Sequence, residues 1–145
     1  MHEIEPGGYV QWIEGDHSQC QIFHNKAGAP ASAAKEVMSF VNAWFKGWLP
    51  GPLRLPELFN ENGLEVLVDE RWATDGLQHK TGWSTYFAPM FIMSGGKAAV
   101  DAKVKTGELS REVADKLLDR AVSEVSKGEI YQHSEMIVYV GRKPL

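Results

Sequence analysis

Cysteine is scarce in this chain, and basic clusters and long apolar runs are missing from it. The one cysteine, Cys20, excludes an internal disulfide framework and is typical of a reducing compartment. Lys and Arg form no cluster longer than two residues, and the formal charge of −4 gives no reason to expect nucleic acid. No apolar run approaches the roughly 20 residues that a membrane-spanning helix needs. We therefore expect a soluble, cytoplasmic protein with neither a nucleic-acid nor a membrane partner.

The composition is that of an ordinary globular protein. The 145 residues are 43% hydrophobic and 23% charged. A chain of this size buries roughly 70% of its unfolded surface, so we expect a single domain over residues 1–145. Aromatic residues and methionines are plentiful, and they either build the core or line an apolar ligand pocket, because both offer large contact areas.

The stretch IEPGGYVQWIEGDH, residues 4–17, predicts a tight turn followed by a strand. Pro and two glycines favour the turn, and the run from Tyr9 to Ile13 has the aromatic and β-branched composition of a packed strand. Glu14, Asp16 and His17 follow where the strand is expected to end, and α/β proteins usually place their chemistry at such points. We expect residues 16–29 to form a helical turn or an active-site loop.

The remaining elements follow from periodicity and from Gly and Pro signals. Ser110 is a good helix cap, and residues 113–125 carry a clean apolar stripe. The predicted elements are helices at 30–48 and 53–62, a strand at 64–72, a helix from 81 with a kink near Pro89, a continuation at 97–105, a helix at 110–128 and a final strand at 130–141.

Three stretches, in this order, resemble class I S-adenosylmethionine (SAM)-dependent methyltransferases, especially those of fungal secondary metabolism. GGYVQWIEGD at 7–16 resembles the entry to the fifth strand of that family, and LPELFNENGLEV at 55–66 resembles the helix and turn that lead into the sixth. IVYVGRKP at 137–144 resembles the last strand and its tail. The resemblance covers nearly the whole chain. It implies an α/β, truncated Rossmann-like methyltransferase fold, in which a small mixed three-stranded sheet packs with about four helices.

The resemblance stops short of the cofactor site. In that family, SAM is held by a glycine-rich loop and an acidic residue that lie N-terminal to the matched region. The chain has no G-x-G-x-x-G, and its Gly-Gly pairs at 7–8 and 95–96 lack a strand-turn-helix context. The resemblance therefore implies the C-terminal half of the fold, and we expect no cofactor.

The resemblance also implies which residues gather at the ligand side. The last strand would lie antiparallel between the two other strands, so that the end of the first strand, the end of the second and the start of the last share one rim. We predict His17, Asp16, His133 and Tyr131 as catalytic acid–base groups, because a histidine with a pKa near 6.5 both gives and takes protons around neutral pH. The predicted substrate-binding residues are Glu14, Phe23, Trp72, Trp83, Tyr86, Phe87 and Met90.

Each of these residues also has an ordinary structural explanation. Asp16 and His17 are equally typical of a loop or a helix cap, His133 of a core or surface position, and the aromatic residues at 83–93 of a helix packed in the core. The histidines lack the spacing of a zinc site, and nothing in the sequence marks a base for Cys20, so we expect no metal and no cysteine nucleophile.

Three hypotheses remain open. The first is a cofactor-independent enzyme of fungal-type natural-product biosynthesis, a cyclase, isomerase or dehydratase that binds a largely apolar small metabolite. The second is a non-catalytic accessory subunit in which a homodimer or a partner chain covers the edge of the first strand, since exposed strand edges are normally covered. The third is a methyltransferase fragment, or a chain that dimerises to rebuild a SAM site.

Overall fold

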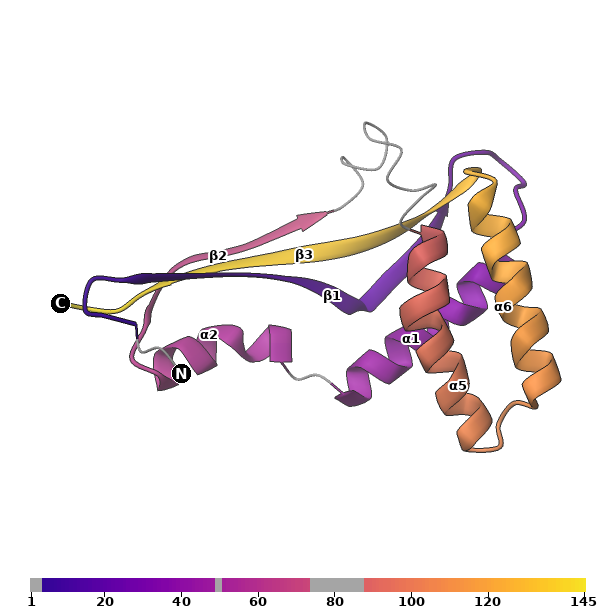
Figure 1. Cartoon of the computed structure of the whole chain (residues 1–145). Coiled ribbons are helices and arrows are strands. Elements are labelled where there is room, and N and C mark those ends of the chain that lie inside the picture. Colours follow the sequence, from indigo (N-terminus) through magenta and orange to yellow (C-terminus); the bar gives the residue numbers. More distant parts are fainter. Residues whose placement is uncertain (1–3, 49–50, 74–87) are drawn as a thin grey trace.

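The computed structural model describes residues 4–48, 51–73 and 88–145 (Figure 1). A long sheet arm extends from one end, and α1, α5 and α6 gather at the other (Figure 1). The chain is mixed α/β, and within the described residues no helix is long and apolar enough to cross a membrane. In chain order, the elements are β1 (Tyr9–His24), α1 (Ser32–Trp48), α2 (Gly51–Glu61), β2 (Glu65–Ala73), the π-helical turn η1 (Ile92–Gly96), α5 (Lys97–Lys105), α6 (Arg111–Ser126) and β3 (Ile130–Arg142).

The last strand occupies the centre of the sheet. The strand order is β1-β3-β2, and β3 runs antiparallel to both neighbours. The expected position of the last strand is therefore correct. The expectation of a mixed sheet needs correction, because β1 and β2 run in the same direction but pair only with β3, which leaves every hydrogen-bonded strand pair antiparallel.

β1 is much longer than the sequence indicated, because it continues through the segment expected to be a loop. After an irregularity between Asp16 and Gln21, residues 21–24 pair with residues 130–133 of β3. Cys20 and Ile22 in this second part are buried against the helices. Strand pairing and burial thus outweigh the polar local sequence.

The larger core lies among the helices. α1, residues 88–105 and α6 bury small and branched side chains against each other and against the far end of β1, including Val37, Val41 and Val100. Gly96 permits this close packing, since a Cβ there would lie 2.8 Å from Val37 Cγ1. The sequence predicts a kink near Pro89, and the structure instead has the π-helical turn η1 further along, at residues 92–96. Ser110 Oγ accepts a hydrogen bond from Val113 N at the start of α6, as predicted.

A smaller core holds α2 against the sheet arm. Phe59 and Leu55 of α2 pack with Ile137 and Tyr139 of β3. Gly141 lets the helix approach, because a Cβ there would lie 2.7 Å from Phe59 Cδ2. These β3 residues alternate with Met136 and Val138, so α2 covers only one face of the arm.

Candidate functional site

The site forms where β1 loses its regular pairing with β3. Asp16 lies opposite Glu135 and Gln21 opposite His133, so five steps along β1 match only two along β3. Irregularities of this kind re-aim side chains and are common next to active sites. The extra residues carry His17 and Cys20 to the junction of the sheet arm and the helices.

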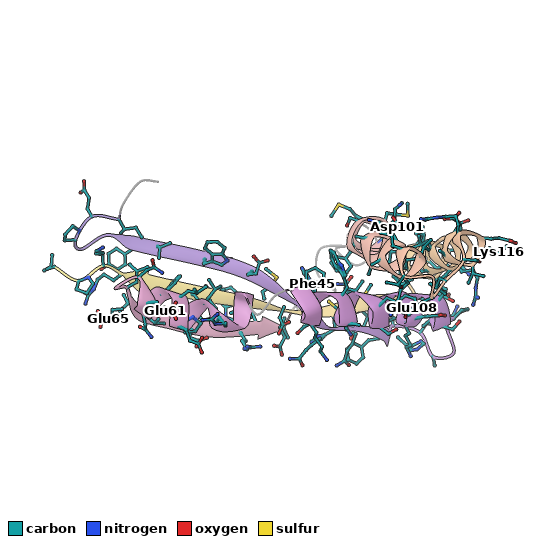
Figure 2. All side chains as sticks on the ribbon, turned by 90° about the horizontal axis from the view of Figure 1, so that it is seen from below. Phe45, Glu61, Glu65, Asp101, Glu108 and Lys116 are labelled. Carbon is teal, nitrogen blue, oxygen red and sulfur yellow. The ribbon has the colours of Figure 1, made fainter. Side chains whose placement is uncertain are left out.

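His17 is held in place by a glycine and two aromatic rings. A Cβ on Gly15 would lie 2.7 Å from both Cε1 and Nε2 of His17, so the imidazole covers the backbone of Gly15. The ring centroids of Phe45 and Phe91 lie 5.1 Å and 5.0 Å from that of the imidazole. Figure 2 shows Phe45 where the helical end meets the arm. His17 therefore lies in a largely apolar setting at this junction.

This setting controls the charge of His17. Burial lowers the pKa of the imidazole below its ordinary value of 6.5, and the nearby carboxylates of Glu14 and Asp16 partly oppose that effect. The resting imidazole is consequently neutral at neutral pH, and the same two carboxylates stabilise the imidazolium that forms when it takes up a proton. These are the properties of a general base.

Cys20 joins His17 to a buried polar network. Its Sγ lies 3.7 Å from His17 Nδ1 and 3.2 Å from Ser134 Oγ. Gln132 Nε2 donates to Ser134 Oγ at 2.9 Å. Burial raises the pKa of the Cys20 thiol, which therefore stays protonated near neutral pH and is a poor nucleophile.

Asp16 faces the other side of the sheet. Its Oδ1 accepts hydrogen bonds from the backbone N and Oγ of Ser18, and Arg71 Nη1 lies 3.5 Å from Oδ2. Arg71 also pairs with Glu135, which lies opposite Asp16 in the ladder. Asp16 thus acts on His17 through its charge, without sharing a face with it.

Tyr131 and His133 belong to a separate aromatic cluster. Phe23 stacks on Tyr131 with ring centroids 5.7 Å apart and meets His133 edge-on at 5.5 Å. Along β3, Tyr131 and His133 alternate with Gln132 and Ser134, so they project from the face opposite the His17 network. The expectation that both histidines line one rim is corrected: the alternation of β3 separates them.

Beside His17, the uncovered face of the sheet carries an exposed apolar row. Gly15, Met136 and Trp72 lie opposite one another across the three strands, and Ile13 precedes Gly15 on the same face. Ile13 is 53% exposed and Trp72 is 57% exposed. We call Ile13, Met136 and Trp72 the apolar shelf. The structure therefore brings one predicted substrate residue, Trp72, to the same face as His17.

The other predicted substrate residues are scattered. Met90 is exposed on the helical residues 88–91, and Glu14 Oε1 accepts a hydrogen bond from the backbone N of Gly15. Trp83, Tyr86 and Phe87 lie outside the described residues.

Sequence reasoning missed the residues that position His17. Phe45 belonged to an apolar helix face and Phe91 to an aromatic helix, and neither pattern shows which member meets a histidine. Gly15 did carry a signal, because a glycine within a strand often marks the close approach of another group.

The described residues present no cluster of metal ligands. They contain no group of three or more His, Cys, Asp or Glu able to hold a metal ion. The segment that joins β1 to α1 contains a single glycine, Gly28, so it is not a glycine-rich nucleotide loop. No known family model matches this chain, and no curated protein shows significant similarity to it.

Proposed function

We propose that this chain is a cofactor-independent enzyme that transfers a proton on a small, largely apolar metabolite, with His17 as the acid–base group. The observation that carries the proposal is a positioned, neutral imidazole directly beside the apolar shelf. The shelf offers contact area to an apolar molecule, and the imidazole beside it supplies the proton transfer that the apolar side chains cannot perform.

The reaction follows from these two features. A metabolite on the shelf places an acidic C–H or O–H group at the imidazole, which removes the proton and becomes a cation. Glu14 and Asp16 stabilise that cation, and His17 then returns the proton to another atom of the same molecule. Such a proton shift is an isomerisation, and it becomes a dehydration or cyclisation if a hydroxyl leaves or a ring closes. Holding the substrate in one conformer contributes further.

The biosynthetic context rests on the sequence resemblance, with which the strand order agrees. A central last strand, antiparallel to both neighbours, is what the resemblance to the C-terminal half of a methyltransferase implies. We infer that the chain acts on natural-product-like metabolites on such a truncated scaffold. A buried free thiol fits work in the reducing cytoplasm.

The test is a set of matched variants incubated with apolar ketones in D2O, with deuterium uptake followed by mass spectrometry. His17→Gln is expected to lower the exchange rate about 10²–10⁴-fold. Gly15→Ala keeps the histidine but displaces its ring, so it should also lower the rate, whereas Gly47→Ala, which meets no atom within 4 Å, should not. Equal rates in wild type and His17→Gln would remove the proposal, and a comparable loss in His133→Gln would remove the single-face site.

A second candidate function is supported by the outer edge of β1. Within the described residues this edge has no strand partner, and residues 9–13 carry neither a charge nor a proline to block pairing. Tyr9 is 63% exposed. A homodimer or an accessory complex in which another strand covers this edge would protect it. A methyltransferase fragment would also need a partner strand at this edge.

Analytical ultracentrifugation separates these alternatives. A wild-type dimer that dissociates in Gln11→Lys, but persists in Asn60→Lys on α2, would support edge pairing. A wild-type monomer at all concentrations would exclude self-pairing. Calorimetric titration with SAM is expected to show no binding, and micromolar binding would instead favour a rebuilt methyltransferase site.

A further inference from the structure

A cavity lies between β1 and α1, away from the apolar shelf. It has a volume of about 340 Å³, which falls within the range of small-molecule sites, about 300–1,000 Å³. Its lining residues are Cys20, Gln21, Ile22, Lys35, Met38, Ser39 and Asn42. We propose that this cavity binds a small carboxylate with a short apolar body.

The charge at its rim selects an anion. The Lys35 ammonium lies 3.2 Å from Nε2 of His24, so its neighbour is a ring nitrogen and not a carboxylate. Because an ammonium carries three N–H donors, Lys35 can donate one to the His24 ring and still offer others to a ligand in the cavity that it lines. A carboxylate placed there accepts from the Lys35 ammonium, and such charge-assisted hydrogen bonds are stronger than neutral ones.

The floor of the cavity selects an apolar body. Ile22 and Met38 line the cavity with the small part of their side chains that the core leaves uncovered. Asn42 fixes the wall by donating from Nδ2 to the Cys20 carbonyl oxygen at 2.9 Å, which ties α1 to β1. A linear chain of roughly six to eight carbons fits a space of this size.

A second cavity, between α1 and α5, differs from the first in the state of its lysine. It measures about 200 Å³, and its lysine, Lys103, already pairs with Glu108 at 2.6 Å and lies 5.8 Å from the centroid of Phe40. The charge of Lys103 is already neutralised by Glu108, so this cavity attracts an anion only weakly. Of the two cavities, the one at Lys35 is the better anion site.

Calorimetry with octanoate and octanol tests the proposal on the full chain. Octanoate is expected to bind the wild type more tightly than octanol, and Lys35→Gln should weaken octanoate about fivefold while leaving octanol unchanged. Lys46→Gln, an exposed lysine at the other end of the same helix, should change neither. Ser39→Phe should fill the cavity and weaken both, with circular dichroism confirming that the helices remain.

Several results would overturn the proposal. These are equal binding of octanoate and octanol, an equal effect of Lys46→Gln, or no octanoate binding at about 5 mM. Inorganic phosphate, which lacks an apolar body, should compete at least about tenfold more weakly, and equal competition would exclude the carboxylate class. His17→Gln should bind octanoate normally, so this site stands or falls independently of the proposed proton transfer.

Discussion

The helical end and the sheet arm are built very differently. Among the described residues, the cluster around α1, α5 and α6 contains twenty buried members, whereas the cluster between α2 and the arm contains five. The helical end is packed from several sides, while the arm is covered on one face only. We infer that the helical end contributes most of the stability, whereas the sheet arm carries the accessible apolar surface.

His17 lies where the two regions meet. Phe45 and Phe91 come from the helical end, and Gly15 and the apolar shelf come from the arm. A functional group needs a rigid support that fixes its rotamer and an open surface that admits a ligand. The junction provides both, which neither region provides alone.

The largest expected difference between the two regions is in the cost of the same truncation. Leu118 in the helical cluster and Leu55 in the arm cluster are 6% and 8% exposed. Leu118→Ala should lower the unfolding free energy by about 4 kcal/mol and Leu55→Ala by about 2 kcal/mol, because the thin arm collapses more easily around a cavity. Urea unfolding measures both losses. Equal losses would break the comparison.

The next prediction concerns how the helical end is tied together. Glu124 of α6 is buried, and its carboxylate accepts hydrogen bonds from the backbone N of Ala33 and of Ala34 at the start of α1. Glu124→Gln should cost about 1–2 kcal/mol, because the negative charge caps the helix N-terminus. Glu112→Gln on the exposed side of α6 is the control and should lie within about 0.5 kcal/mol of wild type. A matching loss in both variants would contradict this role.

A smaller effect is expected in the pH dependence of stability. The pKa of His17 is lowered in the folded chain, so below its ordinary value of 6.5 the unfolded chain binds a proton that the folded chain does not. Stability should therefore fall as the pH drops through 6.5, while above 6.5 both states are neutral and His17 contributes no slope. Urea unfolding of wild type and His17→Gln at about pH 5 to 7.5, the range over which a histidine titrates, measures this contribution. An identical pH dependence in the two proteins would count against a buried, neutral His17.

The sequence predicted the regular elements better than the site. The apolar stripe of α6, its cap at Ser110 and the final strand were evident locally, because each depends on neighbours in the sequence. The extension of β1 to His24 was not, since its polar residues form a strand only through pairing with β3 and burial of Ile22. The separation of His17 from His133 depends on the irregularity in β1 and the alternation of β3, and no local pattern determines how those two combine.

The most direct test of the junction is NMR titration of the His17 imidazole, assigned by comparison with His17→Gln. We predict a pKa below 6.5 in the wild type, because burial beside Phe45 and Phe91 disfavours the cation. Gly15→Ala, which displaces the ring, should move the pKa back toward 6.5. A wild-type pKa at or above 6.5, unchanged in Gly15→Ala, would contradict the account.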